Sequence, residues 1–317
     1  MYESWRCVVR SLLLLMLLPG VGLGQEFSGR PLRIVTSEPG GGNDVMARMI
    51  ANGLTANIGT QVIVENRPST VARPVVAQAS PDGHTILFTT GGFWLLPSEN
   101  EQFDVFRDFS PVTLANRQPN ILCVHPSSTI KSVKELIAVA RTKPGGLNYS
   151  TGAVGSSSHL AAVLFDALAG VKMVRVPYKG AGPALNGLLS NEVHLMFASS
   201  GSVTPYMASG RVRALAVTSA KPSELLPGLP TIADSGVPGY EAVANFGIFA
   251  PIRTPVPIIN RLQRGITEVL HTPEIKDRFS KMGVEVVGST PESLVATIKA
   301  DMARMEKVVK ATGIRAE

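Results

Sequence analysis

A strand, a loop and a helix follow one another in the stretch Ile34-Val35-Thr36-Ser37-Glu38-Pro39-Gly40-Gly41-Gly42-Asn43-Asp44-Val45-Met46-Ala47-Arg48. A short apolar run leads into consecutive glycines, and apolar residues then recur at helical spacing, which predicts a helix with one buried face. Asn43 stands where it can cap that helix. The stretch therefore predicts one unit of an α/β fold.

The glycine turn is also a candidate anion site. Its glycines carry no Cβ, so a ligand can approach the backbone, and the first N–H groups of the helix have no partner within it. A tight turn without a ligand is the alternative. A nucleotide is not expected, because the turn lacks the lysine of a phosphate loop and Val45 replaces the third glycine of a dinucleotide fingerprint.

The N-terminal segment has the pattern of a secretory signal peptide. Arg6 and Arg10 precede an apolar run over residues 11–18, and small residues follow as far as Gly24. This run is much shorter than the roughly 20 residues that span a bilayer. We therefore expect a cleaved signal peptide over residues 1–24 and export to the periplasm.

Length, charge and cysteine content narrow the class of protein. The chain of 317 residues is long enough for about two domains. Its net charge of +6 is mild and suits small acidic ligands, and no cluster of basic and aromatic residues indicates nucleic-acid binding. Cys7 leaves with the signal peptide, so Cys123 has no partner for an intramolecular disulfide.

Further strand and loop units recur along the chain. The strand over residues 85–90 ends at Gly91, and the strand over residues 147–151 leads into a glycine- and serine-rich turn. The strand over residues 174–177 leads into Tyr178-Lys179-Gly180-Ala181. Open α/β sheets bind ligands at the carboxyl ends of their strands, so these loops predict a cleft lined by backbone N–H groups and hydroxyls.

Two apolar strands are candidates for paired crossovers between two lobes. The strands over residues 121–126 and 246–251 each close with proline, and a helix follows each of them. The helix over residues 159–169 carries an apolar stripe at Leu160, Val163, Leu164 and Leu168. The aromatic residues between 103 and 112 are expected to close a core edge.

The predicted cleft is suited to binding rather than to catalysis. The five histidines never fall at metal-ligand spacing, and the nucleophile motif Gly-x-Ser-x-Gly is absent. We expect no metal, no cofactor and no catalytic residue. Ser156 and His159 are expected to hydrogen-bond at a helix start. The adjacent Tyr178 and Lys179 leave acid–base chemistry open as an alternative.

Several ordered motifs resemble one known family, the Bug-type receptors, which are the substrate-binding proteins of tripartite tricarboxylate transporters. The motifs are Pro39-Gly40-Gly41-Gly42-Asn43-Asp44-Val45-Met46-Ala47-Arg48, Val64-Glu65-Asn66-Arg67-Pro68, Pro81-Asp82-Gly83, Gly155-Ser156-Ser157-Ser158-His159-Leu160-Ala161, Val176-Pro177-Tyr178-Lys179-Gly180, Leu215-Ala216-Val217-Thr218 and Leu229-Pro230-Thr231-Ile232. The resemblance covers essentially the whole chain after the signal peptide.

The resemblance implies a two-lobed periplasmic-binding-protein fold of type II, the Venus flytrap. Such receptors bind small carboxylates between the lobes through backbone amides, hydroxyls and bridging waters. We expect one lobe to comprise residues 25–118 plus 248–317 and the other residues 119–247. Closure of the lobes over the ligand would be a hinge motion.

Two departures from the family pattern bear on the ligand. The chain has Ser69-Thr70-Val71-Ala72-Arg73-Pro74 where relatives usually have a glycine-rich turn. Ala198 stands where many relatives have an acidic residue. If that acid contacts a ligand's ammonium group, its absence argues against an amino-acid ligand.

The expected receptor is a monomer that binds a small organic acid and presents it to membrane transporter subunits of the tripartite type. An adaptor that presents the ligand to a membrane sensor, and a hydrolase or isomerase using Tyr178, Lys179 and His159, are the alternatives. Because neither Lys179 nor Arg73 lies on a glycine turn, we expect ligand affinity to depend only weakly on salt concentration. The expected ligand-binding residues are Pro39, Gly40, Gly41, Gly42, Asn43, Asp44, Thr90, Gly91, Thr151, Gly152, Gly155, Ser156, Ser157, His159, Tyr178, Lys179, Gly180, Ala181, Ala198 and Ser199.

Overall fold

The computed structural model describes residues 29–37, 39, 42–95 and 103–312. The predicted signal peptide over residues 1–24 lies outside these residues, and so do Gly40 and Gly41 of the glycine turn.

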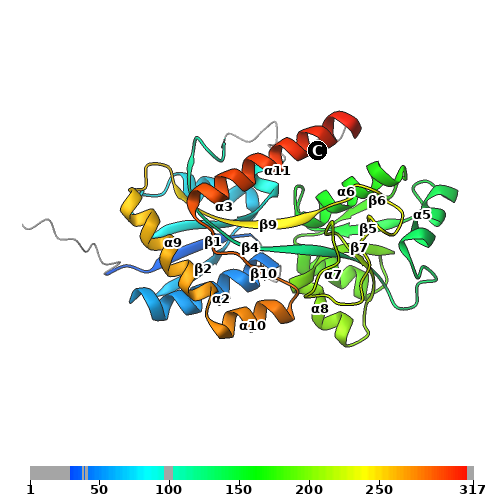
Figure 1. Ribbon diagram of the computed structural model, residues 1–317, viewed down its shortest axis with the longest axis horizontal. Helices are drawn as coiled ribbons and strands as arrows, with labels where there is room; N and C mark the ends of the chain where they lie inside the picture. Colours follow the sequence, from blue (N-terminus) through cyan, green and yellow to red (C-terminus); the bar gives the residue numbers. More distant parts are fainter. Residues whose placement is uncertain (1–28, 38, 40–41, 96–102, 313–317) are drawn as a thin grey trace, which may run out of the picture.

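The strands lie in two groups that meet at the middle of the molecule (Figure 1). They are β1 (Leu32–Thr36), β2 (Val62–Asn66), β3 (Thr85–Thr90), β4 (Phe109–Val124), β5 (Asn148–Thr151), β6 (Val174–Pro177), β7 (Leu195–Ser199), β8 (Arg213–Val217), β9 (Val243–Pro251) and β10 (Glu285–Val286). Their order is β2-β1-β3-β9-β4-β7-β5-β6, and β8 and β10 also pair with β4. The outer pairs are parallel and the central ones antiparallel.

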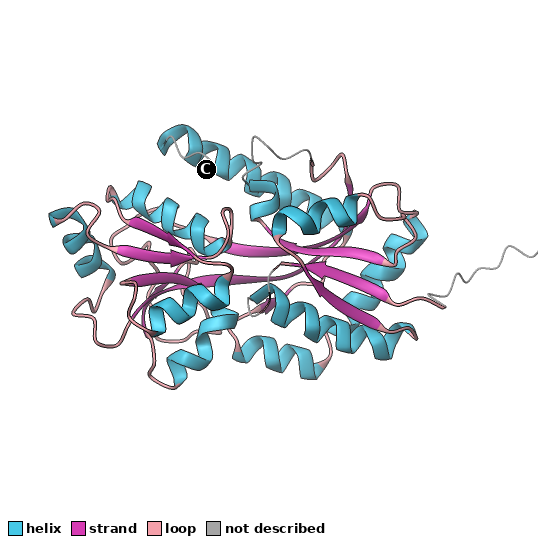
Figure 2. Cartoon of the chain, turned by 180° about the vertical axis from the view of Figure 1, so that it is seen from behind, coloured by secondary structure: helices cyan, strands magenta, loops and turns pink. Residues whose placement is uncertain are grey.

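Helices cover both faces of each group of strands, as Figure 2 shows from behind. They are α2 (Gly42–Ile58), α3 (Ser69–Ala77), α4 (Gly92–Leu95), α5 (Val133–Thr142), α6 (Ser157–Ala169), α7 (Ala181–Leu189), α8 (Ser200–Ala208), α9 (Val256–Leu270), α10 (Pro273–Lys281) and α11 (Pro291–Thr312). In the first group α2, α9 and α10 pack on one face, and α3, α4 and α11 on the other. In the second, α5 and α6 pack opposite α7 and α8. This layering is the predicted α/β architecture.

Strand β4 joins the two halves. Residues 109–119 pair with β9, and the last part of the same strand, from Asn120 onward, pairs with β7 and β8. The sequence predicted only the final part as a strand. Pro111 and Pro119 obscured the rest, although proline is tolerated where register shifts interrupt the ladder, as happens beside Pro111. The lobe boundaries expected from the sequence stay a prediction.

Helix α2 confirms the pattern read from the opening stretch. Met46, Ile50 and Leu54 are fully buried against the first core, so the helix has the expected apolar face. The expected cap is wrong, because the helix already includes Gly42 and Asn43 therefore lies inside its first turn. Between 103 and 112, Phe109 is buried in the core as expected, whereas Phe106 is exposed.

Helix α6 differs from its expected packing. Its core face consists of Ala161, Phe165 and Ala169, together with Leu164. Leu168, the last residue of the predicted stripe, is 41% exposed. Apolar residues of α6 therefore extend beyond the face that packs in the core.

Two further features are the single cysteine that follows the predicted signal peptide and the apolar character of the helices. Cys123 is a buried thiol without a disulfide, and burial raises its pKa. Among the described residues, no helix combines the length and apolar character that a membrane span requires.

Candidate functional site

A polar cavity lies between the two halves, where strands of both groups end. Its volume is about 90 Å³. The described residues that line it are Ser37, Gly42, Asn43, Arg73, Thr89, Thr90, Gly92, Phe93, Gln118, Gly152, Ala153, Val154, Gly155, Ser156, Ser157, Ser158, Gly180, Ala181, Met196, Ser199 and Phe246. Most belong to loops that follow the carboxyl ends of β1, β3, β5, β6 and β7, the position at which open α/β sheets bind ligands.

The amino ends of several helices reach this cavity. α2 contributes Gly42, α6 begins beside Ser156, and α7 begins beside Gly180. The first N–H groups of such helices and the positive end of the helix dipole favour a bound anion. Ser156 is the N-cap of α6, and its hydroxyl accepts a hydrogen bond from the His159 N–H, which confirms the helix-start role expected from the sequence.

Arg73 supplies a positive charge to the lining. It comes from α3, and its guanidinium carbon lies 4.9 Å from the centroid of the Phe93 ring, a cation–π arrangement that holds the group in place. Burial lowers the pKa of Arg73 to about 10, so the side chain keeps its proton at neutral pH. The described lining contains no aspartate or glutamate. Among the described lining residues, Arg73 therefore supplies the charge, and it is positive.

Gln118 of β4 supplies a neutral donor. Its side chain is fully buried, and its oxygen accepts hydrogen bonds from the Ser200 hydroxyl and the Gly201 N–H, both at 3.2 Å. These bonds fix the amide, and its Nε2 has no hydrogen-bond partner among the described residues. Since buried donors in proteins are nearly always satisfied, this N–H₂ group of a lining residue is a candidate donor to a ligand.

The two halves touch beside the cavity. A Cβ atom placed on Gly92 would overlap the carbonyl of Gly155 from the opposite half. A Cβ on Gly42 would lie 3.2 Å from both Gln118 Nε2 and Ser199 Oγ. Glycine at these positions therefore permits the close approach of the two walls.

Several residues expected at the site lie outside the lining. The Asp44 carboxylate pairs with Arg48 at 2.9 Å and accepts from Asn66 at 2.9 Å, so it is held within its own half. Pro39 is exposed. The Gly91 N–H donates to the Asn245 carbonyl at 3.0 Å, and the next glycine lines the cavity instead.

The remaining displaced residues belong to the second half. Thr151 is buried, and its hydroxyl accepts from Arg175 at 2.8 Å. The His159 ring is buried behind the turn, where Nδ1 accepts from the Gly155 N–H at 3.2 Å. Ala198 packs in the core of the second half, whereas the next residue, Ser199, lines the cavity.

The pair of Tyr178 and Lys179 is not at the cavity. The Tyr178 hydroxyl donates to Glu192 at 3.1 Å beside α7, and removal from water together with that carboxylate raises the pKa of Tyr178. Lys179 is exposed. Acid–base chemistry by this pair therefore gains no support from the geometry.

The sequence did not predict Gln118 in the cavity lining, and Arg73 was not expected to bind the ligand because it lies away from the glycine turns. Arg73 stands in the segment that departs from the family pattern, which was a usable signal. Gln118 lies inside a long strand with no local sign of function. The described residues include no group of three or more histidine, cysteine, aspartate or glutamate side chains that could hold a metal ion.

Comparison with known proteins adds an independent line of argument. A family model described as "Tripartite tricarboxylate transporter family receptor" matches residues 46–314. A protein encoded in the tcbD-tcbE intergenic region of Pseudomonas sp. is 36% identical over 292 residues, which cover 89% of this chain and 86% of that protein.

Solved structures show the same fold. Rpa4515 of R. palustris, determined with adipate, is 35% identical with a TM-score of 0.87, and the match covers 91% of this chain and 99% of that one. The periplasmic binding protein BugD is 31% identical with a TM-score of 0.87, covering 92% and 100%. MatC from Rhodopseudomonas palustris, with bound malate, is 28% identical with a TM-score of 0.84, covering 89% and 100%.

Proposed function

Because this chain belongs to the family of tripartite tricarboxylate transporter receptors, we propose that it is a periplasmic solute-binding protein that captures a small organic carboxylate between two lobes. One observation carries the proposal: a cavity between the halves presents the partly buried guanidinium of Arg73 and the amide donor of Gln118, with no carboxylate in its described lining. An anion could accept hydrogen bonds from both groups. Adipate and malate, which the related structures contain, are small organic carboxylates.

The ligand would be held by three kinds of donor. Arg73 would pair with the carboxylate, Gln118 would donate through Nε2, and the helix starts near Gly42, Ser156 and Gly180 would add N–H groups. This assignment changes the expectation of a site built only from neutral donors. The assignment also explains why glycines recur in the loops that line the cavity. A side chain at these positions would block the carboxylate or prevent the close approach of the opposite wall.

Lobe closure would complete the site. We propose residues 25–118 plus 248–317 and residues 119–247 as the two lobes, with β4 and β9 as the connections about which they turn. The ligand would stabilise the closed form because it contacts both lobes only in that form.

The biological setting of the receptor follows from the same family. The signal-peptide pattern of residues 1–24 supports export to the periplasm, and the partners would be the membrane subunits of a tripartite transporter, with the receptor acting as a monomer. Presentation of the ligand to a membrane sensor is the second candidate. An enzymatic role is disfavoured by the position of Tyr178 on Glu192.

A thermal-shift screen of carboxylates tests the proposal. A ligand that binds only the folded state raises the unfolding midpoint with its concentration. We expect at least one mono-, di- or tricarboxylate to do so and to be recovered unchanged. Recovery of an altered product would overturn the receptor assignment.

Replacing Arg73 with glutamine is expected to weaken carboxylate binding at least tenfold, about 1.4 kcal/mol, because the variant loses the charged partner. With Arg73 in the site, the affinity of the wild type should fall as ionic strength rises. The variant should show a smaller fall. Titration calorimetry at low and high ionic strength measures both effects.

The matched control is Arg67→Gln, since Arg67 is half exposed, pairs with Glu65 and lies outside the cavity. It should bind like the wild type. Equal affinities of the Arg73 variant and the wild type would contradict the assigned role of Arg73.

A further inference from the structure

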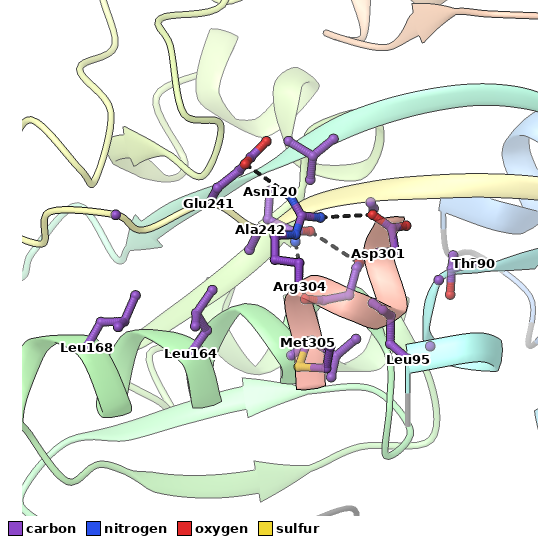
Figure 3. A pocket seen from close by; sticks show the side chains of 17 residues that line it. Thr90, Leu95, Asn120, Leu164, Leu168, Glu241, Ala242, Asp301, Arg304 and Met305 are labelled. Carbon is purple, nitrogen blue, oxygen red and sulfur yellow. Dashed lines mark hydrogen bonds and ion pairs between the residues drawn. The ribbon is translucent and has the colours of Figure 1, made fainter. Parts of the chain in front are cut away.

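A second pocket, mainly apolar, adjoins the polar cavity. Its volume is about 160 Å³, larger than the about 90 Å³ of the polar cavity. Thr90, Gly92 and Ser157 line both spaces, so the two share a wall. Figure 3 shows the pocket between α6 and the carboxyl-terminal part of α11.

The apolar wall of this pocket comes mostly from α6. Leu160, Leu164 and Leu168 lie on successive turns and line it, while Leu95 and Met305 face them from the other half. On the core face of α6, Phe165 packs against Phe197 and Tyr240, and Leu164 belongs both to this core and to the pocket wall. Leu168 keeps 41% of its surface exposed. The pocket therefore accounts for the apolar residues of α6 that lie beyond the core, Leu160 and Leu168.

The charged side chains of the pocket form ion pairs with one another. Arg304 pairs with Glu241 at 2.9 Å and with Asp301 at 3.0 Å, as Figure 3 shows. Asp301 also accepts from the Trp94 indole at 3.2 Å and the Asn245 amide at 2.8 Å. Two carboxylates surround one guanidinium here, so a further anion would be repelled.

We infer that the two spaces form one bipartite site, and that the ligand is a monocarboxylic acid with an apolar body. This inference rests on the proposed function. The carboxylate would lie with Arg73 and Gln118, and the aliphatic or aromatic body would pass Thr90 and Ser157 into the pocket between α6 and α11. The charges at Glu241 and Asp301 would disfavour a second carboxylate at the far end.

Titration calorimetry with butanoate, hexanoate and octanoate tests this inference. We expect affinity to rise about fourfold for each methylene that enters the pocket, equivalent to about 0.8 kcal/mol. Hexanoate should bind at least tenfold more tightly than adipate, which has the same chain length and a second carboxylate. Affinity that is independent of chain length, or adipate binding as tightly as hexanoate, would overturn it.

Two variants locate the chain within the pocket. Ala242→Phe should fill the pocket, so that octanoate no longer binds more tightly than butanoate. Leu168→Glu, at an exposed position that tolerates charge, should weaken octanoate binding at least threefold more than it weakens butanoate binding. Val139→Glu is the matched control, because Val139 is 39% exposed on α5 and lies outside both spaces.

The outcomes separate this inference from the proposed function. If no carboxylate of any kind binds, the proposed function fails and the inference fails with it. If dicarboxylates bind through Arg73 while both pocket variants retain the wild-type chain-length profile, only the inference fails.

Discussion

Replacing Gly92 with alanine is expected to weaken ligand binding at least tenfold, about 1.4 kcal/mol. The added methyl group would overlap the carbonyl of Gly155 in the opposite half, and backbone atoms cannot move aside as the end of a flexible side chain can. Closure would therefore be incomplete, and the ligand would lose contacts with one wall. Titration calorimetry with an acid that binds the wild type measures the loss.

The substitution Gly265→Ala is the control for this experiment. Its added methyl group would meet the side chains of Ile58 and Leu54, at 3.2 Å or more, in the same half, and Gly265 lines neither the polar cavity nor the apolar pocket. We expect it to bind within a factor of about two of the wild type. If both variants bind like the wild type, the contact between Gly92 and Gly155 does not control closure.

Replacing Asp301 with alanine is expected to cost about 3 kcal/mol of unfolding free energy. This carboxylate is only 7% exposed, and it accepts from Trp94 of α4, Asn245 of β9 and Arg304 of its own helix. Its removal leaves buried donors without their acceptor at the point where α11 packs on the strands. Urea unfolding followed by circular dichroism measures the change.

Asp277→Ala provides the comparison, because Asp277 forms an ion pair with Lys281 on an exposed face of α10. Exposed pairs contribute about 0.5 kcal/mol. Equal destabilisation by the two variants would show that the buried network around Asp301 does not fasten α11.

The sequence predicted the repeated strand, loop and helix units well, because their information is local. The apolar spacing after the glycine turn predicted α2, and the turn before His159 predicted the start of α6. Loops at strand ends then placed parts of both cavity walls, including Gly42, Thr90 and Ser157.

The parts that the sequence did not predict depend on contacts between distant segments. Gln118 reaches the cavity because β4 crosses from one half to the other, and Arg73 because α3 packs beside Phe93. A shift of one residue along β7 separates the cavity residue Ser199 from the core residue Ala198. The leucines of α6 suggested a core face, yet Leu160 and Leu168 lie outside the core and line, with Leu164, a pocket completed by α11.

The most direct test of a carboxylate receptor compares an acid with its own primary amide. The acid that raises the unfolding midpoint most and its amide are titrated into the wild-type protein, at low salt and neutral pH. We predict that the amide binds about thirtyfold more weakly, about 2 kcal/mol, because it cannot pair with the Arg73 guanidinium or accept fully from Gln118. An amide that binds as tightly as the acid would contradict the account.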